Sequence, residues 1–113
     1  MAEFKFRMRM TVGDVIAVGP GKIALLEALA ETGSITAAAK SLGMSYRRAW
    51  LLIDELNSAL REPAVSTAQG GAKGGGSKLT PQGEQLVALY REIEARALAH
   101  CEEPIDQLLR MLR

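Results

Sequence analysis

Hydrophobic residues in the middle of the chain recur every three or four positions, first over a short segment and then over a longer one. In the first segment, residues 34–42, the residues Ile35, Ala38 and Leu42 stand at helical spacing. The second segment, residues 45–60, carries one apolar stripe along a helix. The members of that stripe are Ala49, Leu52, Ile53, Leu56 and Leu60. The pattern therefore predicts two consecutive helices.

A short turn containing glycine separates these two predicted helices. Gly43 suits the left-handed position that ends a helix. Ser34 and Ser45 stand where a side-chain oxygen accepts a hydrogen bond from the first turn of a helix. A small-residue helix, a tight turn and a second helix are typical of the helix-turn-helix motif. The spacing leaves one alternative open, an ordinary helical hairpin with surface arginines.

In a helix-turn-helix protein, the first residues of the second helix enter the major groove of DNA. Here these residues are Ser45, Tyr46, Arg47 and Arg48. They supply hydroxyl groups and two guanidinium groups, which suit base edges and phosphates. These four residues are therefore the first candidates for DNA contacts.

The N-terminal part of the chain alternates strictly between apolar and basic residues from Phe4 to Met10. This period of two predicts a strand with one buried face, and we expect its basic face to be mainly solvated. Residues 15–18 predict a second short strand, although the intervening turn is not a strong hairpin signal. Pro20 then suits the start of a helix. That helix extends to Gly33, and its apolar residues are Ile23, Leu25, Leu26, Leu29 and Ala30.

Pro63 ends the second motif helix, and a glycine-rich stretch follows a short β-leaning segment, residues 64–67. We predict a β-hairpin wing across residues 64–80, in which Lys73 and Lys78 provide charge for phosphates. A flexible linker is the alternative. A nucleotide phosphate loop is disfavoured because Gly76 stands where that motif requires lysine.

A long helix is predicted from Pro81 to about residue 101, with Thr80 as its cap. Pro104 interrupts it, and residues 105–112 predict a short final amphipathic helix. Because a small helical core cannot cover such a long apolar stripe, we expect a two-fold homodimer, with folding back onto the chain's own domain as the alternative. The predicted dimer contacts are Leu86, Leu89, Tyr90, Ile93 and Ala97.

These elements predict a mainly α fold with a small β-hairpin wing, which is an α+β winged helix-turn-helix. Residues 1–80 form the predicted DNA-binding domain with its N-terminal strands, and residues 81–113 form the predicted dimerisation helix and terminal helix.

Charge and composition narrow the possible functions. The net charge is only +1, but residues 33–80 carry six bases against three acids, which suits a polyanion locally. No apolar run approaches the roughly 18 residues of a membrane span, so we expect a cytoplasmic protein without membrane contact. One cysteine and one histidine argue against a disulfide framework and a four-ligand zinc site, so no metal or cofactor is expected. His100 and Cys101 are adjacent and point about 100° apart on a helix, which argues against an enzyme.

Several segments resemble the N-terminal DNA-binding domain of the molybdate-responsive transcriptional regulators of the ModE family, a winged helix-turn-helix related to that of LysR-type regulators. The resemblance covers roughly residues 20–100, and its segments are ETGSITAAAKSLGMSYRRAW, DELN, GGAKGGG, LTPQG and LVALY. The combination of SYRRAW with a glycine-rich wing is specific, whereas LTPxG occurs in many LysR-type proteins.

The resemblance implies roles for individual residues. Ser34 and Thr36 would contact phosphates at the start of the first motif helix. Ser45 to Arg48 would enter the major groove, Lys73 and Lys78 would lie in the wing, and the helix from Pro81 would mediate dimerisation. Trp50 matches a tryptophan of the family pattern, and we expect it to pack in the core.

Full-length regulators of this family also carry β-rich molybdate-binding domains. This chain ends 33 residues after Thr80, so we expect no molybdate site in it. The resulting hypothesis is a homodimeric, sequence-specific transcriptional regulator that binds a near-palindromic operator in double-stranded DNA. The alternative is a winged-helix module that binds a protein partner and binds DNA only non-specifically.

Overall fold

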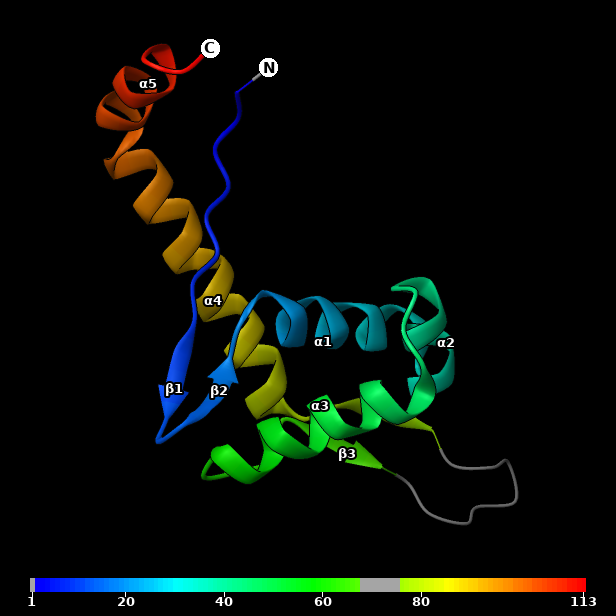
Figure 1. Ribbon diagram of the computed structural model, residues 1–113. Coiled ribbons are helices and arrows are strands. Elements are labelled where there is room, and N and C mark those ends of the chain that lie inside the picture. Colours follow the sequence, from blue (N-terminus) through cyan, green and yellow to red (C-terminus); the bar gives the residue numbers. More distant parts are fainter. Residues whose placement is uncertain (1, 68–75) are drawn as a thin grey trace.

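The computed structural model describes residues 2–67 and 76–113, which form two short hairpins and a set of helices (Figure 1). Helices α1, α2 and α3 pack together, and the long helix α4 projects from this body. The bounds, in chain order, are β1 (Met10–Val12), β2 (Val15–Val18), α1 (Pro20–Thr32), α2 (Ile35–Ser41), α3 (Tyr46–Ala59), β3 (Val65–Thr67), β4 (Ser77–Leu79), α4 (Pro81–His100) and α5 (Glu102–Arg110). The winged helix-turn-helix fold predicted from the sequence is confirmed.

Helix α1 is the centre of the core and is buried on several sides. It packs between α2, α3, α4 and the wing, so its apolar residues are not confined to one stripe. Its end is set by Gly33, which has φ 76° and donates its N–H to the carbonyl of Leu29 at 2.8 Å. A left-handed glycine ends the helix and lets the chain turn directly into α2. The fully buried large side chains of the core are Ile23, Leu25, Leu26, Leu29 and Leu56.

Serine caps define both helices of the helix-turn-helix. The Ser34 Oγ accepts a hydrogen bond from the N–H of Ala37 at 3.0 Å, and the Ser45 Oγ accepts one from the N–H of Arg48 at 3.1 Å. Gly43 lies between the helices with φ 68°, a left-handed conformation that glycine adopts without a steric penalty. The cap and turn signals read from the sequence are confirmed at all three positions.

Strands β3 and β4 form the wing as an antiparallel pair, with Val65 opposite Leu79. The wing is fastened to the helices at its outer end, where the N–H of Ser77 donates to the carbonyl of Gly33 at 3.2 Å. The predicted hairpin is therefore confirmed, rather than the flexible linker. Its glycine-rich tip, residues 68–75 with Lys73, lies outside the described residues.

Asn57 of α3 holds the inner end of the wing. Its Oδ1 accepts hydrogen bonds from the N–H groups of Ala64 at 2.8 Å and Val65 at 3.3 Å. Its Nδ2 donates to the carbonyl of Val65 at 3.1 Å. Because Ala64 and Val65 are buried, this one side chain satisfies backbone groups that water cannot reach.

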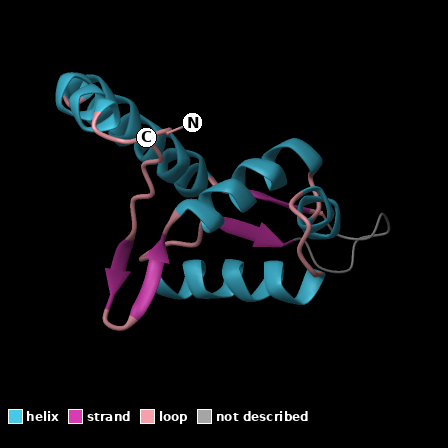
Figure 2. Cartoon of the chain, turned by 45° about the horizontal axis from the view of Figure 1, so that its top comes forward, coloured by secondary structure: helices cyan, strands magenta, loops and turns pink. Residues whose placement is uncertain are grey.

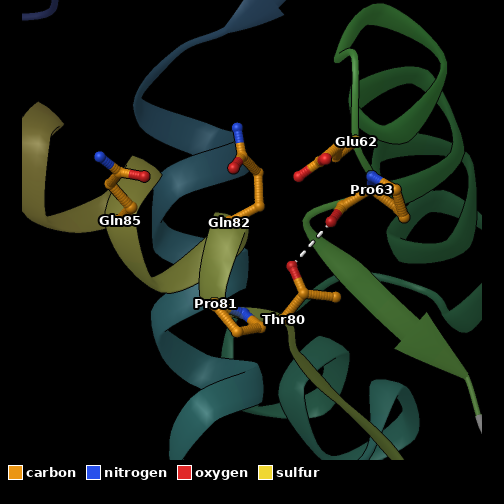
Figure 3. A pocket seen from close by; sticks show the side chains of 6 residues that line it. All are labelled: Glu62, Pro63, Thr80, Pro81, Gln82 and Gln85. Atoms are coloured by element: carbon orange, nitrogen blue, oxygen red, sulfur yellow. Dashed lines mark hydrogen bonds between the residues drawn. The ribbon is translucent and has the colours of Figure 1, made fainter.

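The segment LTPQG joins the wing to α4 (Figure 3). The Thr80 Oγ1 caps α4 by accepting from the N–H of Gly83 at 3.0 Å, and it donates to the carbonyl of Pro63 at 2.7 Å. A Cβ on Gly83 would lie 2.2 Å from the carbonyl oxygen of Ala64. Position 83 therefore requires glycine because α4 and the start of the wing approach each other closely.

The strand predicted over Phe4–Met10 is wrong except at its last residue. Strand β1 begins at Met10 and pairs with β2 in a small sheet separate from the wing (Figure 2). Residues 2–9 pair with no strand of the described chain and instead run beside α4, where the hydroxyl of Tyr90 donates to the carbonyl of Met8 at 2.8 Å. Without a sheet, the apolar side of this segment is only partly covered: Met8 packs against the core, whereas Phe4 is exposed and stacks on Phe6.

Helix α4 leaves the body after its first half. Its buried residues are Gly83 and Tyr90, and α5 at its far end has no buried residue. This extension gives the molecule overall extents of 58 × 29 × 24 Å. Among the described residues, no helix combines the length and apolar character that crossing a membrane would need.

Candidate nucleic-acid interface

The first turn of α3 is exposed, as the sequence predicted. Ala49, Ile53 and Leu56 are buried and fix which side of α3 faces the core. Tyr46, Arg47 and Arg48 consequently lie at the surface, directly after the Ser45 cap. Neither arginine forms an ion pair with another described residue. Both guanidinium groups are thus available for an external anion.

The start of α2 and the wing lie next to this helix end. Ser34 is half-buried and its oxygen already accepts the capping hydrogen bond, whereas Thr36 is exposed in the first turn of α2. Lys78 is exposed on β4. The bond from Ser77 to Gly33 holds the wing beside the turn that leads into α2. The structure therefore brings α2, the wing and the start of α3 to one end of the body, away from α4 (Figure 1). Thr36 belongs to α2 and Lys78 to the wing.

The core position predicted for Trp50 is wrong, because its side chain is half exposed on α3. It follows Tyr46 by one helical turn, as Leu51 follows Arg47, and these four side chains line one surface hollow of about 360 Å³. The reason is angular. The residues that face the core, Ala49 and Ile53, leave Trp50 about 100° from Ala49 around the helix. Trp50 and Leu51 are therefore surface residues that sequence reasoning assigned to the interior or left without a role.

Two further basic residues lie on the opposite flank of α3. Arg7 and Arg9 line a second hollow, of about 280 Å³, together with Arg48. The alternating pattern alone predicts a mainly solvated basic face, whereas the i, i+2 spacing of the two arginines is the signal that could have grouped them. No described residue forms an ion pair with either arginine, so this flank carries a net positive charge.

Lys22 lies behind that hollow and is the one charged residue buried among the described residues. Its ammonium group donates to the carbonyl of Ile16 and lies 3.1 Å from the carboxylate of Glu55 on α3. A buried charge of this kind requires such partners. Lys22 therefore fastens α3 to α1 and β2, and it is not available for DNA.

The five predicted dimer contacts differ in how far they are exposed. Leu89 and Ile93 are exposed on α4. Leu86 packs against the core, and Ala97 is half-buried. Tyr90 is 2% exposed and belongs to the core of its own chain, so its place among the dimer contacts is corrected. Burial raises the pKa of its hydroxyl group, which donates to the backbone.

An ion cluster joins α4 to α1 at the edge of the core. Arg91 donates to both carboxylate oxygens of Glu27, at 2.6 and 2.9 Å, and to Glu94 at 2.6 Å. The hydrogen bonds from Arg91 lower the pKa of Glu27, and the two carboxylates raise the pKa of Arg91. This cluster fixes the direction in which α4 leaves the body, and it lies away from α3.

A surface hollow of about 490 Å³ lies between the loop after α3 and the start of α4. Figure 3 shows the side chains that line it. Two glutamines and two prolines contribute to its wall, and Thr80 is engaged with Pro63. Glu62 is its single ionisable group. The described residues also contain no group of three His, Cys, Asp or Glu side chains placed to hold a metal ion. The candidate binding site on the described surface is therefore the group of exposed cations around α3.

Comparison with known proteins agrees with this geometry. Residues 21–84 match the family described as bacterial regulatory helix-turn-helix protein, lysR family. The chain is also 49% identical over 78 residues to the molybdenum-pterin-binding protein MopB of Rhodobacter capsulatus, a match that covers 69% of this chain and 29% of MopB.

Two further relatives carry the name ModE. Identity is 41% over 96 residues to the molybdenum transport protein ModE of Azotobacter vinelandii, covering 83% of this chain and 36% of that protein. Identity is 44% over 71 residues to the DNA-binding transcriptional dual regulator ModE of Escherichia coli K12, covering 63% and 27%. The matched region spans about a third of these relatives or less. Since the family match includes α1, the helix-turn-helix, the wing and the start of α4, the chain belongs to the lysR family of bacterial regulatory helix-turn-helix proteins.

Proposed function

We propose that this chain is a sequence-specific double-stranded DNA-binding regulator of transcription that acts as a homodimer. One observation carries the proposal: the Ser45 cap and the buried face of α3 leave Arg47 and Arg48 free at an exposed helix end. The relatives named transcriptional regulators share this region, which supports the same assignment.

In the proposed complex, α3 enters the major groove by its first turns. A guanidinium group can donate two hydrogen bonds to the O6 and N7 atoms of guanine, so Arg47 on the outer side of α3 is the candidate for direct base recognition. Arg48 lies on the flank with Arg7 and Arg9, where the three cations suit phosphates on one wall of the groove.

Contacts to the other wall come from α2 and the wing. Thr36 lies in the first turn of α2, where free backbone N–H groups favour an anion. Ser34 serves chiefly to cap that turn, and its hydroxyl can still donate one hydrogen bond outward. Lys78 adds a cation from β4. Lys73 belongs to the same proposed set but lies outside the described residues.

The uncovered apolar residues of α4 support the proposed homodimer. Leu89 and Ile93 expose nearly half of their side chains, although they stand at the spacing of a packing face. A second copy related by a two-fold axis would cover both at once. Two copies of α3 would then meet a near-palindromic operator whose half-sites lie about 34–36 Å apart, or a multiple of that distance.

The test uses the purified full chain and DNA fragments selected from genomic DNA for binding. We expect Arg47→Ala to weaken binding to the selected site by about 10–100-fold, because a bidentate arginine–guanine contact contributes about that much discrimination. Arg48→Ala should weaken binding to all sequences alike and reduce the salt dependence by about one unit. The control is Arg110→Ala on α5, far from α3, which should change neither. Unchanged affinity of the folded Arg47 and Arg48 variants, verified by circular dichroism, would remove the proposed site.

The alternative is a winged-helix module that binds a protein partner. One observation favours it, namely the three apolar side chains exposed on α3 beside Arg47. The ratio of specific to non-specific DNA affinity separates the two functions, since regulators typically reach about 10³ or more. A ratio near one at physiological salt would favour the alternative.

A further inference from the structure

The strongest unexplained feature of the surface lies on the outer side of α3. Tyr46, Trp50 and Leu51 expose 54%, 46% and 47% of their surface, and we call them the apolar patch. They are contiguous, because together with Arg47 they line one hollow of about 360 Å³. Single exposed apolar residues are common, but a contiguous group marks a binding surface.

The core of the body does not need these side chains. Ala49, Ile53 and Leu56 supply the buried face of α3, and each is at most 5% exposed. The apolar patch lies outside this buried face, so the folding of a single chain does not require apolar side chains there.

Its position points to DNA. The patch occupies the same first turns of α3 as Arg47 and Arg48, and the side chain of Arg47 lines the same hollow. Phosphates attract these cations, so the duplex brings its base edges directly against the apolar groups. The apolar feature that the major groove offers is the 5-methyl group of thymine.

We propose that the apolar patch recognises the 5-methyl groups of thymines in the major groove. This inference rests on the function proposed above and assigns to the same helix a second kind of base recognition, beside the hydrogen bonds of Arg47. Apolar contact with a methyl group distinguishes thymine from cytosine without any hydrogen bond.

Trp50 is the best-positioned member of the patch. Its indole also lines a hollow of about 170 Å³ with Ile35 of α2 and Val65 of the wing, so it lies between three elements. Leu51 follows it by one residue and points about 100° further around the helix, so the two side chains meet different base pairs.

The experiment removes only the methyl group. In the operator selected with the full-length chain, each thymine is replaced singly by deoxyuridine, and affinity is measured by fluorescence anisotropy at fixed salt. We expect a loss of about 3–10-fold at one or two thymines of each half-site, as for one buried methyl group, and little change elsewhere.

Protein variants then assign the effect to the patch. Trp50→Ala and Leu51→Ala should bind the thymine operator less tightly and no longer distinguish it from the deoxyuridine operator. Val12→Ala is the matched control, because Val12 is also apolar and exposed but lies in the β1–β2 hairpin. It should keep the full discrimination, and circular dichroism verifies that every variant is folded.

The outcomes are distinct. Tight, sequence-specific binding that is insensitive to deoxyuridine at every position would overturn this inference and leave the proposed function intact. Discrimination that persists in both Trp50→Ala and Leu51→Ala would also overturn it. Absence of any sequence preference would overturn the proposed function and this inference with it.

Discussion

The body of the molecule and its projecting arm, residues 91–112, both contain amphipathic helices, but they bury their apolar residues to opposite extents. In the body, Ala49, Ile53 and Leu56 of α3 are each at most 5% exposed. In the arm, Ile93, Leu98 and Leu108 are exposed by 40%, 38% and 61%. The same periodic pattern therefore has two outcomes, and the surrounding elements decide which one occurs.

The difference shows what each region can do alone. Burial of apolar surface contributes about 25 cal/mol per Å², so the body obtains its stability from within one chain. The arm buries little apolar surface and no residue of it is fully buried, so its exposed apolar residues are available to a second copy. Tyr90 marks the boundary, since it is the last buried residue along the chain. The body can thus fold as a unit, and we expect the exposed apolar side chains of the arm to be buried against a partner.

The largest expected effect tests the packing of the body. Gly83→Ala places a Cβ 2.2 Å from the carbonyl oxygen of Ala64, so α4 or the wing must shift. We expect a loss of about 3 kcal/mol or more in the free energy of unfolding, measured with urea. Gly21→Ala is the control, because its Cβ meets no atom within 4 Å, and it should be neutral or stabilising by about 0.5 kcal/mol. Equal stabilities of the two variants would contradict the close approach.

The next effect tests how the wing is held. Asn57→Ala leaves the buried N–H groups of Ala64 and Val65 without their acceptor, which should cost about 2–3 kcal/mol of unfolding free energy. Hydrogen exchange of these two amides should accelerate more than exchange in α1. Ser58→Ala, an exposed change one residue away, should stay within about 0.5 kcal/mol. If these two amides exchanged as slowly in Asn57→Ala as in the wild type, other contacts would be sufficient to hold the wing.

A substitution in the arm should change self-association rather than the stability of the single chain. Ile93→Asp places a charge in the proposed dimer contact, so we expect self-association to weaken at least about tenfold while monomer stability changes little. Sedimentation velocity over a range of concentrations measures the first quantity, and urea unfolding of the dilute chain measures the second. Glu92→Gln, an exposed change in the residue before it, is the control. A chain that is monomeric at every concentration would end the dimer proposal.

The smallest effect lies at the joint between the two regions. Arg91 lowers the pKa of Glu27 below its ordinary value of 4.5, so this contact stabilises the fold above about pH 4.5 and is lost as the pH falls through the lowered pKa. Glu27→Gln should remove that part of the acid sensitivity. Both side chains are partly exposed, so the change should be small. Urea midpoints between pH 3 and about 6 would measure it, with Glu31→Gln as the exposed control on the same helix. Identical profiles for Glu27→Gln and the wild type would contradict the role of the pair.

Local signals in the sequence identified most of the helix and strand boundaries. Ser34, Gly43 and Ser45 act through neighbours within four residues, so their positions alone specify the caps and the turn. The wing was predictable for a similar reason, because two β-leaning segments flank a glycine-rich tip. The candidate contacts at the start of α3 follow directly from these caps.

The errors share a different cause. Phe4 to Met10 has the period of a strand, but a strand forms only when another strand is available, and here the segment contacts α4 at Met8 instead. Trp50 matches the family pattern and was expected in the core, whereas the buried face of α3 is already filled by Ala49 and Ile53. Tyr90 stands on the stripe of a helix predicted to face a partner, yet Met8, far away in the sequence, binds it within its own chain.

By itself the sequence determined the order of the elements, their caps and turns, and the presence of two arginines at the start of the second motif helix, because short-range hydrogen bonds and helical periodicity are local properties. Only the tertiary structure decided which apolar residues are covered. It placed Tyr90 inside, left Trp50 and Leu51 on the surface of α3, and left the arm without cover. Burial depends on which distant segments meet, and that information is not contained in the periodicity of any one helix.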